Sequence, residues 1–528
     1  MVPFGTPATI KATAPAATDS GYAGLAKTRA AAVRSVAAGL CAVAIVMAVI
    51  PLAVLQIPDA ITWALPASLA AAGPNAVASL LRASGLALPA MAIAVPFGAL
   101  AVRRMRAGPV LLAGLLVIAA GDLLGDTTRT VLEIGVDRSL HGLGAGIAIV
   151  AVVAIVAEQR KAAQQEAAHP QAMQLKATHR GTGHWLAGWW AAVTVAGLAA
   201  APELMRHRVT SGGWHAALQP YPWLTGAALA LAALYAVLAE GTATAAARSV
   251  FPVAERSQLA LLAAPVAGMC AITVAVSYLG DRAAAAAAVG CAIALSGIAA
   301  ITARAGTAAR FAVVCAVTGF TLAPAAGAVT ALTQPTVASG CAALAAALCG
   351  AAIALMPRCA PAGSRAITAA GLLLAASGFC ALYLAGTGHA PTLLCVPLAA
   401  GLAAALTSSL RATAAAGAMA GMVILLAGVV AGYLAAGAWQ LHALAGARTA
   451  QAIHGALVTA AGGWALVAAG VTAAVALALV GAALAGTWRE SGTWRESGHL
   501  PRSEPTSELD DAAAGSPPAS AGGAPDHG

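Results

Sequence analysis

The chain has 528 residues, of which 60% are hydrophobic, 9% charged and 4% aromatic, and its formal net charge is +9. Soluble globular chains carry roughly 25% charged residues, so 28 basic and 19 acidic side chains cannot build a water-facing surface for a chain of this length. Apart from the two polar ends, these figures exclude a soluble domain, a disordered chain, a coiled coil and a secreted disulfide scaffold. They indicate that lipid surrounds most of the chain.

The chain opens with a polar tail over residues 1–35, which lacks the compact apolar core and small-residue cleavage site of a signal peptide. We therefore expect an uncleaved first helix to follow it. A helix crosses the hydrocarbon of a membrane in about 20 residues, and breaks at Pro, Gly and clusters of charge predict fourteen such helices. They cover residues 36–58, 78–101, 108–125, 134–157, 185–202, 222–239, 258–279, 283–302, 311–331, 337–356, 366–386, 391–409, 415–438 and 456–485.

The basic residues predict the orientation of these helices. Cytoplasmic loops are richer in Lys and Arg, and most of the 28 basic residues fall on one side when both termini are placed inside. Their dispersal in short clusters between apolar runs argues against a nucleic-acid-binding protein, which would carry one basic stripe. We expect a multi-pass protein of the plasma membrane with both termini cytoplasmic. Weak boundaries in the Ala-rich stretch 283–356 leave twelve or thirteen helices open.

The last segment, residues 487–528, is rich in Ser, Pro, Gly and acidic residues, and we predict a disordered cytoplasmic tail. It holds two consecutive copies of TWRESG, at 487–492 and 493–498, which we interpret as a local duplication. A docking role for this repeat is the alternative.

The motifs of enzymes are missing from the sequence. It has no Walker loop, GxSxG elbow, dinucleotide-binding glycine run or metal-spaced set of His and Cys. The nine cysteines include no C-x-x-C pair and are expected to be small packing residues. We therefore expect neither enzyme activity nor a cofactor or metal site.

The loop between the second and third predicted helices contains a first transporter-like motif. Residues 96–106 read PFGALAVRRMR and are followed by an apolar run. This resembles the Gly-x-x-x-Asp-Arg-x-Gly-Arg loop of the major facilitator superfamily. Gly98, Arg103 and Arg106 match it, whereas Val102 stands where the family has Asp and Met105 where it has Gly.

The fourth predicted helix carries the best match to that superfamily. Residues 138–145 read RSLHGLGA and resemble the family's Arg-x-x-Gln-Gly-x-Gly-Ala. Arg138, Gly142 and Gly144 match, and His141 replaces Gln.

Two further segments resemble motifs of the drug:proton antiporters in this superfamily. In the fifth predicted helix, Gly197 and Pro202 match the antiporter motif Gly-x-x-x-Gly-Pro-x-x-Gly-Gly, while Ala201 replaces a Gly. Residues 64–66, ALP, resemble the end of the first helix of the fourteen-helix branch, where the nearest carboxylate here is Asp59.

These four motifs, in order along residues 57–206, imply an all-α membrane fold with two six-helix bundles around a central cavity. The implied bundles span residues 36–245 and 311–486, with two inserted helices at 258–302. Gly98, Arg103, Arg106, Gly142, Gly144, Gly197 and Pro202 are the implied gate and motif residues.

Carboxylates at membrane depth are costly and usually functional. Those outside the tails and cytoplasmic loops are Asp59, Asp122, Asp126, Glu133, Asp137, Glu203 and Asp281, and all but the last lie in the first bundle. At 1.5 Å per residue, Asp122 lies about 21 Å along the third helix from Gly108, on the side where the fourth helix begins.

We predict that Asp122 carries a proton, that Arg138 favours its ionised form, and that His141 relays the proton or orients Arg138. Asp59 is a further proton-coupling candidate. Under the alternative interpretation, Asp122, Asp126 and Glu133 cap helix ends at the outer interface, Asp137 is a local ion partner, and His141 is a packed polar residue.

The second bundle is almost free of charge. Its scattered polar groups are Thr318, Thr321, Thr330, Tyr383, Thr407, Ser408 and Tyr433. Such a wall suits lipophilic substrates better than sugars or phosphates, which need many hydrogen bonds or an Arg cluster.

We therefore expect a proton-coupled exporter of hydrophobic or cationic small molecules such as drugs or natural products. Its partners would be a small lipophilic substrate, protons and the bilayer. The alternative is a transporter-like membrane protein without coupled transport, which acts as a scaffold, sensor or lipid-handling partner.

Overall fold

The computed structural model describes most of residues 30–49 and, with short gaps, residues 83–168, 188–198, 222–240, 306–356, 361–385, 391–444 and 450–496. These residues form apolar helices, and none of them lies in a strand. The predicted fold class, an all-α protein, is therefore confirmed.

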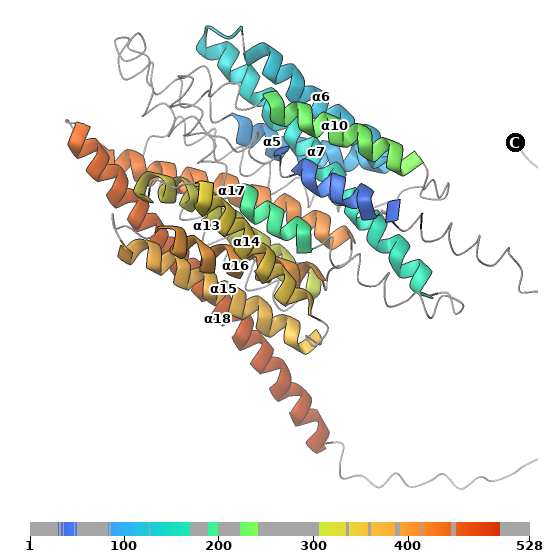
Figure 1. Cartoon of the computed structure of the whole chain (residues 1–528). Coiled ribbons are helices and arrows are strands. Elements are labelled where there is room, and N and C mark those ends of the chain that lie inside the picture. Colours follow the sequence, from blue (N-terminus) through green and yellow to red (C-terminus); the bar gives the residue numbers. More distant parts are fainter. Residues whose placement is uncertain are drawn as a thin grey trace, which may run out of the picture. The chain divides into compact units, whose positions relative to one another are not determined.

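A first group of helices contains α5 (Ala87–Arg104), α6 (Ala107–Gly125), α7 (Val131–Ala168) and α10 (Pro222–Glu240). α7 packs against both α5 and α6, and α10 packs against α6 (Figure 1). Short helical stretches at Val36–Val46 and Gly188–Leu198 are also described.

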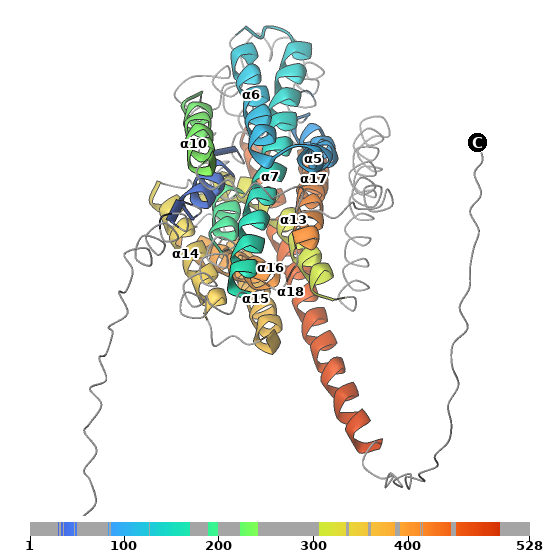
Figure 2. The ribbon, with the colours of Figure 1, turned by 90° about the vertical axis from the view of Figure 1, so that its right-hand side faces the viewer.

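A second group contains α13 (Thr307–Thr333), α14 (Val337–Leu355), α15 (Pro361–Ala385), α16 (Pro391–Arg411), α17 (Ala415–Leu444) and α18 (Ala450–Glu496). α16 packs against α14 and α15, and α13 packs against α17, as can be followed in Figure 2. The compact unit that contains both groups ends at Ala482, and Ala483–Gly528 form a second unit.

Each helix predicted outside residues 258–302 overlaps helical residues in the part of the chain that the structure describes. The predicted pair at 258–279 and 283–302 lies outside the described residues, so the count of fourteen and the bundle boundaries stay predictions. By length and composition alone, four described stretches could cross a membrane: Ala107–Gly125, Val131–Val156, Ser364–Leu384 and Val458–Ala482. The other apolar stretches are shorter or interrupted.

Glycines bring neighbouring helices into backbone contact. A Cβ placed on Gly114 of α6 would lie 2.7 Å from the carbonyl oxygen of Gly144 on α7, and one on Gly144 would lie 2.5 Å from the carbonyl oxygen of Gly114. Gly371 on α15 and Gly401 on α16 face each other in the same reciprocal way. Because apolar surface gains little by burial inside a lipid bilayer, such close approach and its dispersion attraction hold the helices together.

The two glycine contacts belong to one repeated arrangement. Both pairs have the same spacing in the sequence. In the set α5–α7 and in the set α14–α16, the third helix packs against the first two. When the two glycine pairs are aligned, Gly121 corresponds to Gly378 and His141 corresponds to Leu398. A Cβ on Gly121 would meet the His141 ring, and a Cβ on Gly378 would meet Leu398. The helices α5–α7 and α14–α16 therefore form an internal repeat.

Candidate proton-binding site

Four ionisable side chains come together where α6 and α7 pack. Asp122 lies on α6, near its end, and Asp137, Arg138 and His141 lie on the first turns of α7. Asp122 is 7% exposed and the other three are 0% exposed. Charged groups are almost never buried to this degree without partners, so the four side chains must be considered together.

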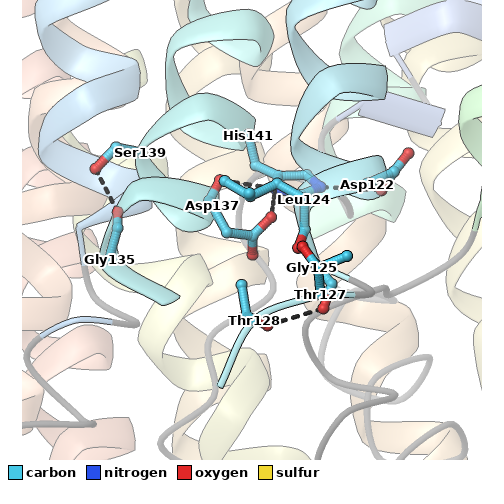
Figure 3. Close-up of polar contacts among 9 residues, drawn as sticks. All are labelled: Asp122, Leu124, Gly125, Thr127, Thr128, Gly135, Asp137, Ser139 and His141. Carbon is cyan, nitrogen blue, oxygen red and sulfur yellow. Dashed lines mark hydrogen bonds and ion pairs between the residues drawn. The ribbon is translucent and has the colours of Figure 1, made fainter. Parts of the chain in front are cut away.

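His141 is the centre of this cluster. Its Nε2 lies 3.0 Å from Oδ1 of Asp122, across the interface between the two helices. Its Nδ1 lies 2.9 Å from the backbone carbonyl oxygen of Asp137 and 3.2 Å from that residue's Oδ1. Figure 3 shows the ring held between the two aspartates.

The contacts of Nδ1 decide where hydrogen sits on the ring. A backbone carbonyl oxygen can only accept a hydrogen bond, so Nδ1 must be the donor. Nε2 then faces Asp122 in one of two states: an imidazolium that donates to a carboxylate, or a neutral imidazole that accepts from a carboxylic acid. Both states hold one proton between Nε2 and Oδ1. Without that proton a lone pair would face a carboxylate, and the contact would become repulsive.

The formal charge of the cluster depends on the same proton. The two carboxylates are balanced by the Arg138 guanidinium, which interacts electrostatically with Asp137 and Asp122, and by the proton shared with His141. Loss of this proton would leave one uncompensated negative charge in a buried position, which is costly. The arrangement can therefore take up and release one proton, and the proton stabilises the contact between α6 and α7.

Local sequence explains the position of the ring. Asp137 and His141 are one helical turn apart, so they lie on the same face of α7. The ring packs on Gly121, where an added Cβ would lie 2.7 Å from Nδ1 and 2.8 Å from Cε1. A residue with any side chain at position 121 would displace the imidazole.

A capping box closes the start of α7. Oε2 of Glu133 accepts hydrogen bonds from the backbone N–H groups of Arg129 (2.6 Å) and Thr130 (2.9 Å), and the Thr130 hydroxyl accepts from the N–H of Glu133 at 3.3 Å. This is the reciprocal pattern of a Thr-x-x-Glu box. Glu133 therefore acts as a helix cap, as the alternative interpretation expects, while Asp122 contacts His141.

The implied gate and motif residues lie apart from this cluster or pack helices together. Gly98 faces the Cα of Ile147, Gly142 approaches the backbone of Ala87, and Gly144 faces α6. Gly197 is buried in the stretch Gly188–Leu198. Arg103 lies on α5 and Arg106 is exposed just after it. Asp59, Asp126, Pro202, Glu203 and Asp281 lie outside the described residues.

One member of the cluster differs from its sequence-based interpretation. The sequence suggests for Asp137 only the role of a local ion partner of Arg138, its neighbour in the chain. The structure places it against His141 through both its carbonyl and its carboxylate. The four-residue spacing of Asp137 and His141 is a signal that would have indicated this contact.

No protein-family model and no curated protein matches this sequence. Solved structures do resemble it. A mutant of the peptide transporter POT has a TM-score of 0.50 at 15% identity, covering 84% of this chain and 94% of that one. The alafosfalin complex of a POT mutant has a TM-score of 0.49 at 14% identity, with the same coverage. A structure of proton dependent oligopeptide transporters has a TM-score of 0.47 at 13% identity, covering 84% of this chain and 98% of that one.

The chain shares the fold of the POT peptide transporter. That transporter belongs to the major facilitator superfamily, the superfamily that the sequence motifs resemble. At 15% identity the likeness concerns the fold alone. It does not test the assignment to the drug:proton antiporter branch, which stays a prediction.

Proposed function

We propose that this chain is a proton-coupled secondary transporter of small molecules, and that the transported proton is held between Asp122 and His141. The 3.0 Å contact between Nε2 and Oδ1 carries the proposal, because it is buried, joins two helices and is attractive only while it holds a proton. The fold shared with POT supports the same class of function by analogy.

A change in protonation would be coupled to helix movement in the following way. The proton compensates a buried charge and keeps α6 and α7 in contact at Asp122 and His141. Its release would make the contact repulsive and favour a second arrangement of the helices, in which the site is hydrated. A substrate that binds the two arrangements with different affinity would then be moved against its gradient at the expense of the proton gradient.

We propose a small lipophilic or amphipathic substrate, because the buried hydroxyls of the second half are mostly used up internally. Thr318 and Thr321 donate to the carbonyl oxygens of Val314 and Val317, each at 2.7 Å. Hydroxyls bonded within their own helix offer little to a polar substrate, which suits hydrophobic or cationic compounds better. A short peptide is the second candidate, favoured by the shared fold with POT.

The test uses purified protein in vesicles that hold a proton gradient, to which lipophilic cations, neutral drugs and di- or tripeptides are added in turn. We expect at least one class to dissipate the gradient with the wild type. Asp122→Asn and His141→Gln should abolish this effect, since neither amide can hold the shared proton. Glu133→Gln serves as the control, because it changes a carboxylate on α7, the helix of His141, that only caps the helix end.

Thermal unfolding in detergent verifies that each variant is folded. Undiminished proton movement in folded Asp122→Asn would remove this residue from the coupling site. Failure of every compound with the wild type would favour the scaffold, sensor or lipid-handling role over transport.

A further inference from the structure

The helical stretch Gly188–Leu198 contacts both members of a helix pair in the second group. The ring centroid of Trp190 lies 6.4 Å from that of Phe311 on α13. A Cβ placed on Gly188 would lie 2.6 Å from Cδ1 of Leu355, the last residue of α14. Trp189 is exposed, and the other residues of the stretch are buried. This helix is therefore enclosed by protein and lies against the second group.

Two polar side chains of this helix have no hydrogen-bond partner. Trp190 is 3% exposed and Thr194 is 0% exposed. Neither Nε1 of Trp190 nor Oγ1 of Thr194 forms a hydrogen bond in the part of the chain that the structure describes. The indole N–H is a donor only and is held in a rigid ring, so it cannot turn to a carbonyl of its own helix.

Other buried threonines use their hydroxyl within the helix. The hydroxyls of Thr318, Thr321 and Thr472 each donate to the carbonyl oxygen four residues earlier, at 2.7 Å. Thr194 makes no such bond to the carbonyl of Trp190. Because Trp190 and Thr194 are four residues apart, they lie on the same face of the helix. One helix face therefore carries two unused donors.

Unused donors are costly at this position. A donor that is buried without a partner has lost its hydrogen bonds to water and gained none in return. At 1.5 Å per residue, Trp190 and Thr194 lie about 8 Å and about 14 Å from the start of the predicted span at residue 185. Both are therefore below the membrane surface, where bulk water does not reach them. A ligand with an acceptor oxygen would restore the missing hydrogen bonds.

We propose that Trp190 and Thr194 bind a carbonyl oxygen of the transported compound, an inference that rests on the proposed transport function. The indole can only donate, so the group that it binds must be an acceptor. The Phe311 ring beside the indole suits an aromatic or other apolar body around that oxygen. The substrate class is thereby narrowed to lipophilic compounds that carry a ketone, ester or amide. Such a compound reaches the two donors when the contact between Trp190 and Phe311 opens.

The test is the thermal stability of the purified full chain in detergent, titrated with 9-fluorenone and with fluorene. These two planar compounds have nearly the same shape, and only the first has a carbonyl oxygen. We expect 9-fluorenone to raise the unfolding temperature of the wild type at lower concentration than fluorene does.

Trp190→Phe keeps an aromatic ring next to Phe311 and removes the N–H, and Thr194→Val keeps the shape of the side chain and removes the hydroxyl. Each variant should need a roughly fivefold higher concentration of 9-fluorenone for half-maximal stabilisation, the loss of one hydrogen bond. The response to fluorene should stay unchanged, which corrects for any change in packing. Without ligand, Thr194→Val should unfold at no lower temperature than the wild type, since it removes an unpaired buried hydroxyl.

Trp464→Phe is the matched control. Trp464 on α18 is 4% exposed, its ring centroid lies 5.3 Å from that of Phe320, and its Nε1 also has no partner in the described part of the chain. The residues three and four positions away from it are Ala or Val, so its face of the helix carries no second donor. We expect this variant to bind 9-fluorenone as the wild type does.

Equal stabilisation by the two compounds, no stabilisation by either, or unchanged 9-fluorenone affinity in both Trp190→Phe and Thr194→Val would overturn the proposal. The titration uses no proton gradient, so its result is separate from that of the transport assay. Binding of 9-fluorenone that depends on Trp190, without proton movement in vesicles, would keep this site and reject coupled transport. Coupled transport without preference for the carbonyl compound would do the reverse.

Discussion

At the scale of single residues, the placement of His141 depends on the absence of a side chain at position 121. The imidazole packs on Gly121, and this leaves Nε2 facing Asp122 and Nδ1 facing the carbonyl of Asp137. A ring with both nitrogens engaged has no freedom to adjust. Gly121 therefore positions the candidate proton-binding site without taking part in it.

We expect Gly121→Ala to impair proton coupling in a folded protein. The new methyl group would lie 2.7 Å from Nδ1, so the ring must move and lose one of its two contacts. Overpacking of this kind costs about 1–3 kcal/mol of stability. Thermal unfolding and substrate-driven proton movement measure the two effects separately.

Gly378→Ala is the positional control in the second copy of the repeat. Its methyl group would lie 2.9 Å from the backbone nitrogen of Leu398, so a comparable loss of stability is expected without a specific loss of coupling. If both variants lost coupling in proportion to their stability, Gly121 would have no positioning role.

The candidates Asp122, Arg138 and His141 could be predicted from the sequence, because buried charge stands out in a chain with so few charged residues. Their pairing could not. Position along a helix gives depth in the membrane, but which face of α6 meets α7 depends on the glycine contacts. The contact of Asp137 needs no such knowledge, because its four-residue spacing from His141 places both residues on one face of α7. Glu133 is a cap because Thr130 stands three residues before it.

At the scale of helices, glycines and alanines determine how closely the helices approach, and they also blur the helix ends in the sequence. The predicted spans fall on the helices, yet α7 and α18 run well beyond them. Polar residues after the apolar run end the span in a hydropathy pattern, but they do not end the helix. The sequence also contains many Gly-x-x-x-Gly pairs, so only the structure distinguishes the contacts from chance.

Gly144→Ala should separate α6 from α7. Its methyl group would lie 2.5 Å from the Gly114 carbonyl oxygen and 2.8 Å from the backbone nitrogen of Ile118, and backbone atoms cannot rotate away. We expect a loss of about 1–3 kcal/mol, reduced by up to about 1 kcal/mol from better helix propensity. Chemical or thermal unfolding in detergent measures it.

Gly470→Ala on α18 isolates the propensity effect, since nothing lies within 4 Å of a Cβ there. Unchanged or slightly higher stability is expected for this variant. A similar loss in both variants would show that the glycines act through chain flexibility and not through close contact.

At the scale of the whole molecule, the described contacts and the basic residues agree on one orientation. The ends of α14 and α16 and the start of α13 share one end of their group, together with Arg310, Arg365 and Arg411. Placing this end in the cytoplasm satisfies the preference of basic residues for that side. The turn between α6 and α7 is then predicted to face outward.

Two single cysteines in a cysteine-free background test this orientation. Thr127→Cys, in the exposed turn after α6, should react with an impermeant maleimide on intact cells. Met356→Cys, at the exposed end of α14, should react only after the membrane is opened. The reverse pattern would invert the predicted topology.

At the positions of the buried cluster, the internal repeat carries charge in only one of its copies. Positions equivalent to Asp122, Arg138 and His141 hold Phe379, Cys395 and Leu398. The proposed site is neutral with its proton and carries one negative charge without it, and the membrane voltage acts only on net charge. It can therefore contribute on the order of 2.3 kcal/mol per 100 mV to the movement of the empty site, and nothing to that of the loaded one. A potential that is negative inside would drive the empty site outward and so hasten the return step of each cycle.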